Sequence, residues 1–285
     1  MFTVTQRANS VKQPKHGYLP VNCFSKTFVN DEKFLSRIEN VPPCFIGLAV
    51  DYLTRFVIGE DKLDVFHISI KGIRRAEYMT KIDIYDRIKV KWLDNITGNN
   101  QLSVICALKL VTFDSWGRNL EGSYDEWKES GEYYFKSHNI KPDDATINNI
   151  MIMVQRSVDF WKKYGPITKQ GFTFQGGYTL TVLTGDGDFM TEDTLWEFKT
   201  SKYEPKSEHT LQLLMYWVMG MHSIHPEYKK IKKLGIFNPR LNVVYLYNLS
   251  KLSDEVIKAI EDDVICYDEF TAGYLDTNFK SILDM

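Results

Sequence analysis

The sequence lacks closely spaced cysteines, long apolar runs and a marked excess of charge of either sign. Its four cysteines lie far apart, so we expect neither a zinc ribbon nor an iron–sulfur cluster held by neighbouring cysteines. No window approaches the ~18 consecutive apolar residues of a membrane-spanning helix, and no apolar stretch follows the first lysines. We therefore expect a cytoplasmic protein that does not contact membranes. Its four cysteines should be reduced thiols in the core, at Cys23, Cys44, Cys106 and Cys266.

Internal repeats, low-complexity tracts and a G-x-x-x-x-G-K-[ST] loop are also missing, and the missing loop excludes a nucleotide-hydrolysing motor of that type. The net charge of −2 does not by itself indicate a nucleic-acid partner. Two segments nevertheless concentrate basic residues, as a groove that follows phosphate groups requires, although solvated helix faces would give the same pattern. These residues are Lys71, Arg74, Arg75, Lys81, Arg87, Lys89 and Lys91 in one segment, and Lys229, Lys230, Lys232, Lys233 and Arg240 in the other.

The chain of 285 residues does have the composition of an ordinary globular protein, with 44% hydrophobic and 25% charged residues. This length allows one elaborated domain around a sizeable core, and we expect one compact domain. Residues 1–43 should form an extended arm or edge strand, followed by a short helix from Asp31 to near Pro42. Residues 44–72 should contain a first core helix, to about Ile58, and a connection.

Residues 73–164 have helical spacing and are predicted to be a helical insertion, with helices over 78–92, 102–113 and 147–164 and a loop over 116–130. Residues 165–285 then combine Thr-, Tyr- and Val-rich strands with glycine turns. We expect strands over 172–174, 178–184, 195–200, 234–237 and 243–249, a helix from the N-cap Ser207 to Met221, an Asn238-Pro239 turn and a helix over 254–263. The order predicts an α/β fold: a central mixed sheet flanked by helices, with a helical insertion.

One predicted hairpin places charged groups in a specific pattern. Because strand side chains alternate between faces, Glu197 and Lys199 share one face while Trp196 and Phe198 share the other. If the turn consists of residues 192–193, Asp188 lies opposite Glu197.

Two carboxylates opposed at ~5 Å repel one another unless a cation joins them, so the register favours a hard divalent metal, Mg²⁺ first and Mn²⁺ second. An acidic turn with a surface salt bridge would give the same residues. Asp186 is the rival carboxylate, but in this register it falls outside the pair.

Downstream, Gln212 and Tyr216 are spaced i, i+4 and share a helix face, with His209 one turn earlier. The other face of this helix is apolar. A polar stripe on such a helix requires a partner, which is either a buried hydrogen-bond network or a substrate.

Together these residues resemble the PD-(D/E)XK nuclease superfamily. Gly185 and Asp188 match its G-x-x-D motif, and Glu197-Phe198-Lys199 matches (D/E)-x-K. The pair Gln212 and Tyr216 is similar to the Q-x-x-x-Y motif of the RecB-type branch, which includes recombination and CRISPR-associated exonucleases. In Gly47-Leu-Ala-Val-Asp51, aspartate stands where an earlier family motif usually has histidine. The resemblance covers roughly residues 44–58 and 166–250.

The resemblance implies a restriction-endonuclease-like core that hydrolyses DNA with Mg²⁺ or Mn²⁺ and needs no iron–sulfur cluster. Asp188, Glu197 and the Phe198 carbonyl would hold the metal, with Asp51 as a further ligand. Lys199 would orient the attacking water, and Gln212 and Tyr216 would position DNA and support Lys199. Candidate DNA contacts are His209, Lys202, Arg74, Arg75, Lys232 and Lys233.

Three activities are compatible with these motifs. The first is an exonuclease or DNA end-processing enzyme in recombination, repair, phage biology or defence. In that case the helical insertion would be a clamp or a surface for a homo-oligomer or protein partner. The second is a sequence-specific restriction-type endonuclease whose insertion reads bases. The third is a non-catalytic DNA-binding protein with a nuclease-like fold, which the complete D…E-x-K set disfavours.

Overall fold

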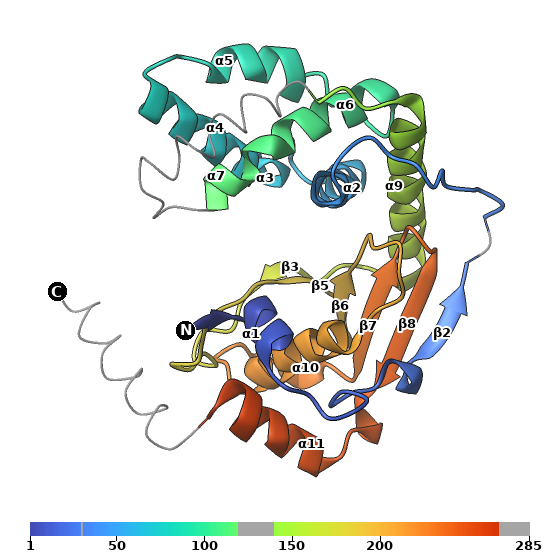
Figure 1. Cartoon of the computed structure of the whole chain (residues 1–285), viewed down its shortest axis with the longest axis vertical. Helices are drawn as coiled ribbons and strands as arrows, with labels where there is room; N and C mark the ends of the chain where they lie inside the picture. The colour runs from blue at the N-terminus through green and yellow to red at the C-terminus, as the bar shows by residue number, and fades with distance from the viewer. Residues whose placement is uncertain (30, 119–139, 268–285) are drawn as a thin grey trace. The chain divides into compact units, whose positions relative to one another are not determined.

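The computed structural model describes residues 1–29, 31–118 and 140–267, and the chain forms two compact units (Figure 1). The sheet unit comprises residues 1–29 and 164–285, and the helical unit comprises residues 30–163. The sequence instead predicted one compact domain with residues 44–72 in its core. These residues belong to the helical unit because their helices pack against helices of the predicted insertion.

The sheet unit is built on a mixed six-stranded sheet with the strand order β2-β8-β7-β6-β5-β3. Strands β6 and β7 are parallel, and all other neighbours in this sheet are antiparallel. The predicted α/β class with a mixed sheet is therefore confirmed. The strands are β2 (Ser25–Phe28), β3 (Lys169–Phe172), β5 (Gly187–Met190), β6 (Thr194–Phe198), β7 (Lys233–Asn238) and β8 (Val243–Asn248), while β1 (Phe2–Thr3) and β4 (Val182–Thr184) form a separate parallel pair.

Most of the predicted strands are found, but two are displaced or shortened. The strand predicted over 172–174 is β3, which ends at Phe172. The strand predicted over 178–184 is reduced to β4 because the Thr179 hydroxyl accepts the Thr181 and Val182 amides, which makes a turn. The Asn238-Pro239 turn is confirmed, since the Asn238 side-chain oxygen accepts the amides of the next two non-proline residues.

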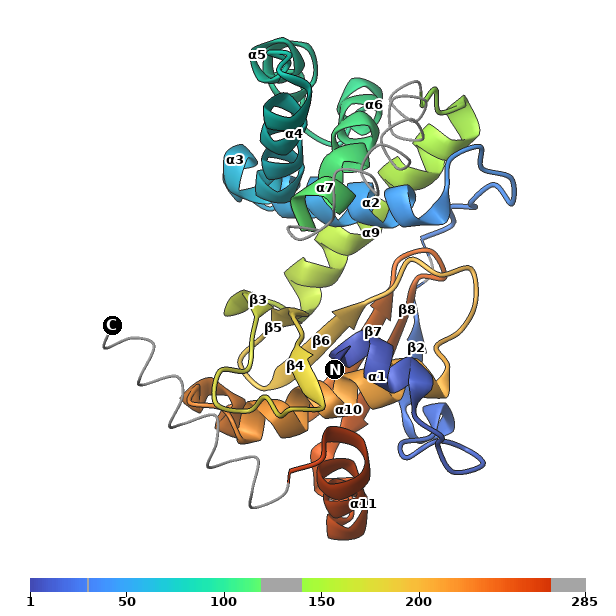
Figure 2. The ribbon, with the colours of Figure 1, turned by 60° about the vertical axis from the view of Figure 1, so that its left-hand side comes forward.

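Helices α10 (Ser207–Met221), α1 (Val4–Ser10) and α11 (Asp254–Ala259) belong to the sheet unit, and α1 lies across α10 (Figures 1 and 2). Leu195 and Ile236 of the sheet and Leu214 of α10 are fully buried in one apolar cluster. A π-helical turn at Ile260–Ile265 extends α11, so the helix predicted over 254–263 is present.

The N-terminal segment differs from the prediction. Strand β2 is the expected edge strand, but Val4–Ser10 form a helix rather than an extended arm. The cause is a reciprocal cap: Thr3 accepts the Gln6 amide at 3.1 Å, and the Gln6 side chain accepts the Thr3 amide at 2.9 Å. Capping satisfies amides that would otherwise remain unpaired at a short helix.

The face of the sheet opposite α10 is aromatic, as predicted. Trp196 is 1% exposed, its indole N–H donates to the Thr191 hydroxyl at 3.1 Å, and its ring meets that of Tyr164 edge to face. Position 235 on the neighbouring strand must be glycine, because a Cβ atom there would come within 2.2 Å of the Trp196 ring. Strand β6 is therefore fixed by packing behind its charged face.

The helical unit contains α2 (Pro43–Val57), α3 (Lys62–Val65), α4 (His67–Thr80), α5 (Tyr85–Ile88), α6 (Gln101–Leu110), α7 (Asp114–Arg118) and α9 (Asp144–Tyr164). The helices predicted over 45–58, 102–113 and 147–164 are confirmed by α2, by α6 with its 3-10 extension, and by α9. The helix predicted over 78–92 is interrupted because Lys81 adopts a left-handed conformation with φ 59°. Trp116 lies in α7 rather than in the predicted loop, whose residues from 119 onward lie outside the described residues. No helix in the described parts of the chain is long and apolar enough to cross a membrane.

The four cysteines are free thiols, but the prediction that all of them lie in the core is wrong. Cys106 is buried and Cys266 is partly buried, whereas Cys23 and Cys44 are exposed.

A buried carboxylate connects the helices of the helical unit. Asp114 is 2% exposed and accepts hydrogen bonds from the hydroxyls of Tyr52 and Ser69. Burial raises the pKa of Asp114, while these donors and the Arg118 guanidinium at 3.7 Å oppose the shift. Three helices, α2, α4 and α7, are thus joined at one polar centre.

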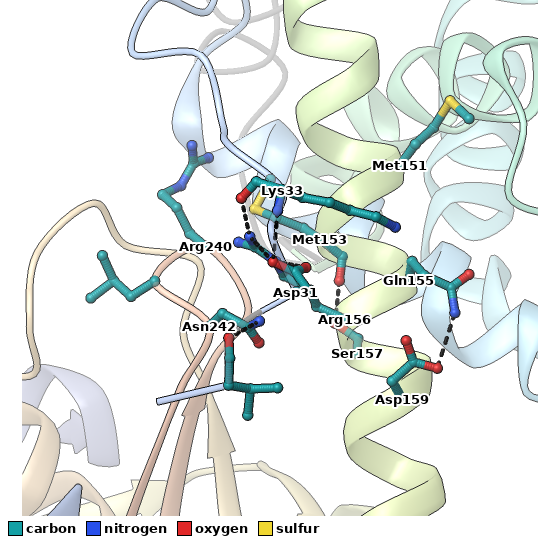
Figure 3. Close-up of polar contacts among 12 residues, drawn as sticks. Asp31, Lys33, Met151, Met153, Gln155, Arg156, Ser157, Asp159, Arg240 and Asn242 are labelled. Carbon is teal, nitrogen blue, oxygen red and sulfur yellow. Dashed lines mark hydrogen bonds and ion pairs between the residues drawn. The ribbon is translucent and has the colours of Figure 1, made fainter. Parts of the chain in front are cut away.

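Residues 31–42 do not form the predicted helix, because their polar groups bond to α9 instead of to one another. The Ser36 amide and carbonyl both bond to the Asn149 side chain, and the Asn40 amide bonds to the Thr146 hydroxyl. In Figure 3 the Arg156 guanidinium reaches Asp31 through two hydrogen bonds of 2.6 and 2.8 Å. The segment is held by side chains of the helix it crosses.

We predict that Arg156→Ala lowers the free energy of unfolding of the helical unit by about 1–3 kcal/mol at pH 7, because charged hydrogen bonds at a buried guanidinium are lost. The hydrogen bond from Arg156 lowers the pKa of Asp31, so its contribution is present above that carboxyl's ordinary pKa and disappears as the pH falls through the lowered value. Urea unfolding followed by circular dichroism measures the change.

The control is Lys162→Ala on the same helix, which removes an exposed ion pair with Asp159 and should change stability by less than about 1 kcal/mol. Equal effects of the two substitutions at pH 7 would contradict the assigned role of Arg156.

Candidate active site

The hairpin of β5 and β6 has the register predicted from the sequence. Phe189 pairs with Trp196 and Met190 pairs with Leu195, and the Thr191 amide donates to the Thr194 carbonyl at 3.0 Å across the turn. In the next position of this register, Asp188 lies opposite Glu197. Asp186 falls before the first residue of β5, so it is outside the pair.

The side chain of Asp188 ends the ladder between the two strands. Its Oδ2 atom accepts the Phe198 amide at 2.7 Å, a bond that holds the carboxylate over the end of β6. Gly187 permits the close approach of β5 to β3, since a Cβ atom there would lie 2.0 Å from the Phe172 ring. The G-D-G-D segment therefore supplies both a carboxylate and a glycine that the packing of β5 against β3 requires.

Glu197 is a buried carboxylate, with only 4% of the residue exposed. Its Oε1 atom lies 2.6 Å from the Lys199 ammonium, whereas its buried Oε2 atom has no hydrogen-bond partner among the described residues. Burial lowers the pKa of Lys199, but the charge and hydrogen bond of Glu197 and the charge of Asp188 outweigh this and raise it. Lys199 therefore keeps its proton and its positive charge beside Glu197 and Asp188.

Helix α10 supplies the polar partners of Lys199. The ammonium donates to Gln212 Oε1 at 3.3 Å, and Gln212 Nε2 donates to the Tyr216 hydroxyl at 2.7 Å. The Tyr216 hydroxyl donates in turn to the Asp186 carbonyl at 2.8 Å. Burial first, then the charges of Glu197 and Asp188, raise the pKa of Tyr216, so the hydroxyl stays protonated and remains a donor.

A residue that no sequence motif indicated joins this network from the N-terminus. The Thr5 hydroxyl of α1 accepts a 3.3 Å hydrogen bond from Gln212 Nε2. The signal for α1 was present as the Thr3-x-x-Gln6 capping box, which marks a helix start. No local pattern indicates that this helix packs on α10.

The start of α10 also differs from the prediction. The helix begins at Ser207, but the N-cap is Lys206, whose amide donates to His209 Nδ1 at 3.1 Å. Burial lowers the pKa of His209 to about 4, with a further contribution from the Lys199 charge. His209 is therefore a neutral acceptor at the helix start rather than a cationic DNA contact at neutral pH.

The remaining predicted DNA contacts are scattered. Lys202 is exposed just after β6, at the same end of the sheet as Lys199. Lys232 and Lys233 lie at the opposite end, because Lys233 pairs with Thr194 at the beginning of β6, and its ammonium is bound to Asp193 at 2.9 Å. Lys232 and Lys233 therefore lie at the turn of the hairpin, at the opposite end of β6 from Lys199.

Two further candidates are in the helical unit. Arg74 is exposed, pairs with Glu77 at 3.0 Å and lies over the Tyr85 ring, while Arg75 is partly buried. Asp51 of α2 also belongs to this unit, where burial first, followed by the charge of Glu60, raises its pKa to about 6 against the opposing charge of Arg55. Its role as a further metal ligand stays a prediction.

The hairpin has donor atoms that suit a hard divalent cation. Asp188 and Glu197 offer carboxylate oxygens, and the buried, unpartnered Oε2 of Glu197 would gain a partner from a cation. No group of three or more His, Cys, Asp or Glu residues arranged for a metal occurs in the described ranges. A cation here would complete its shell with water and backbone oxygens, as Mg²⁺ usually does. The predicted Phe198 carbonyl would be one such oxygen.

We predict that the His209 imidazole remains neutral down to about pH 4 instead of titrating near its ordinary value of 6.5. Because the folded chain resists protonation, the stability associated with the neutral ring is complete above pH 6.5 and is lost as the pH falls toward 4. Lys199→Ala should raise this pKa, whereas Lys230→Ala should leave it unchanged. An NMR titration of the ring protons measures it, and a midpoint near 6.5 in the unaltered chain would refute the prediction.

Comparison with known proteins gives no function that could be transferred to this chain. The chain matches no protein-family model, no curated protein sequence and no solved structure. The chemistry of the hairpin and α10 is therefore the basis for a functional proposal.

Proposed function

We propose that the chain is a metal-dependent deoxyribonuclease of the PD-(D/E)XK superfamily, of RecB type, that hydrolyses phosphodiester bonds. The sheet unit would be its restriction-endonuclease-like core. The observation that supports this most directly is the buried Oε2 atom of Glu197, which has no hydrogen-bond partner in the described chain and lies across the hairpin from Asp188. Leaving a buried carboxylate oxygen without a partner is costly, and a bound cation or a water molecule held by one would satisfy it.

Asp188, Glu197 and the Phe198 carbonyl would hold Mg²⁺ or Mn²⁺. Such a cation, when bound, supplies charge neutralisation at a phosphate oxygen and makes water more acidic. The Phe198 amide keeps Asp188 oriented, and Lys199 stays charged at neutral pH because its pKa is raised. Its ammonium can orient a water molecule and offset negative charge that develops on the phosphate.

Gln212 and Tyr216 would act as positioning residues. They connect Lys199 to the backbone of Asp186 through the hydrogen bonds of the α10 network. A non-catalytic DNA-binding protein would not need a buried carboxylate opposite a second one, and for this reason the enzymatic proposal is favoured over a DNA-binding shell.

We predict that Asp188→Asn, Glu197→Gln and Lys199→Ala each reduce magnesium-dependent DNA cleavage by more than about 100-fold, because ligand or water-orienting groups are lost. Tyr216→Phe should reduce it by about 10- to 100-fold, because it acts through Gln212 and the Asp186 backbone. Cleavage of a labelled DNA substrate measures activity, and circular dichroism verifies folding.

Asp186→Asn is the matched control for Asp188→Asn. Asp186 is exposed, and only its backbone carbonyl takes part in the network, so its substitution should leave cleavage within about threefold of the unaltered chain. Full magnesium-dependent activity in both Asp188→Asn and Lys199→Ala would overturn the proposed function.

The mode of cleavage is tested with linear and closed circular DNA in the presence of Mg²⁺. We expect end-dependent loss of linear DNA, as an exonuclease or end-processing enzyme produces. Cutting of closed circles would indicate the restriction-type alternative instead. Binding without any cutting would indicate a DNA-binding protein.

A further inference from the structure

An exposed aromatic side chain lies at the same end of the sheet as Lys199 of the candidate site. Phe28, at the end of edge strand β2, is 67% exposed. Phe28 pairs with Val243 of β8, and Val243 pairs with Asn238 of β7. When the β6–β7 register is continued by one residue, Asn238 pairs with Lys199. Directly paired residues project from the same face, so Phe28 and Lys199 share one face of the sheet, three strand spacings or about 14 Å apart.

The loop from Lys199 to α10 is anchored at its beginning. Its first two carbonyls, of Thr200 and Ser201, accept hydrogen bonds from Arg240 at 2.7 Å and from Asn238 at 2.8 Å. The Tyr203 amide donates to the Ser201 hydroxyl at 3.0 Å, and Pro205 is buried. Tyr203 is nevertheless 75% exposed, so an anchored loop presents an aromatic ring to solvent.

The loop and the edge strand are joined by Lys26. Its ammonium pairs with Glu204, the neighbour of Tyr203, and also lies 4.6 Å from the centre of the Phe28 ring. Lys26 thereby neutralises the acidic group of the loop, whose other charged residues, Lys202 and Lys206, are basic and exposed. Two exposed aromatic rings thus stand beside basic groups at the end of the sheet that carries Lys199.

We propose that Phe28 and Tyr203 form a base-stacking platform for single-stranded DNA, which directs an unpaired strand toward the hairpin. Aromatic rings interleaved with cations bind single strands, because unpaired bases stack on the rings while phosphates meet the cations. Bases in a duplex stack on one another and do not offer their faces to such rings. The inference rests on the proposed function and specifies its substrate as a single-stranded or frayed DNA end.

Fluorescence anisotropy with a labelled oligothymidylate and with a blunt duplex, both in EDTA, tests the platform without cleavage. Tyr203→Ala and Phe28→Ala should each weaken single-strand binding by about 5- to 150-fold, and Tyr203→Phe should retain it. Duplex binding should change by less than about twofold. The control is Phe34→Ala in the helical unit, where Phe34 is 89% exposed and its substitution should have no effect.

The salt dependence separates stacking from charge. Tyr203→Ala should leave the slope of log Kd against log salt unchanged, whereas Lys202→Ala should reduce it by about one. Unchanged single-strand binding in both aromatic variants, an equal loss for duplex, or no single-strand binding by the unaltered chain would each overturn the platform. If the unaltered chain binds no single-stranded DNA, a protein partner becomes the favoured occupant of this surface. If the unaltered chain binds single-stranded DNA in a Tyr203-dependent way but does not cleave DNA with Mg²⁺, only the nuclease proposal is refuted.

Discussion

The burial of Glu197 on the central strand β6 is the constraint on which the candidate site depends. Removing a carboxylate from water costs several kcal/mol, and this cost is recovered only if charges and hydrogen bonds surround it. Lys199 satisfies one oxygen at 2.6 Å, and the other oxygen has no partner among the described side chains. The same strand buries Trp196 on its reverse face, so the carboxylate cannot turn away from its position without disrupting an aromatic core.

The second constraint is that Lys199 itself must be held. Gln212 and Tyr216 form a hydrogen-bonded path from this ammonium to the backbone of Asp186, two residues before Asp188. Both halves of the hairpin are therefore connected through one helix. Thr5 adds the N-terminal helix to the same path, so the first residues of the chain contribute to the order of the site. In the proposed function, a site supported in this way would be organised before substrate binds, which favours electrostatic stabilisation over rearrangement.

The end of the sheet beyond Lys199 collects groups that are distant in sequence. Arg240 and Asn238 hold the loop after β6, and Lys26 joins that loop to the edge strand. The parallel pairing of β6 with β7 is responsible, because it places the two strand ends, and the loops that follow them, side by side. Because buried donors anchor this loop, it does not collapse onto the sheet, and Tyr203 stays exposed.

Local patterns in the sequence determined the α/β class, the α10 helix, the hairpin register and the shared face of Glu197 and Lys199, because alternation and helical spacing act over a few residues. Long-range packing decided the rest. Residues 31–42 bond to α9 instead of forming a helix, the N-cap of α10 is Lys206, and Asp51 belongs to a separate helical unit. The partners of Gln212 and Glu204 also come from tertiary structure, since no nearby residue indicates that Thr5 approaches Gln212 or that Lys26 lies beside Glu204. Such contacts depend on which surfaces are buried against each other, and that is settled only when the whole sheet and its helices assemble.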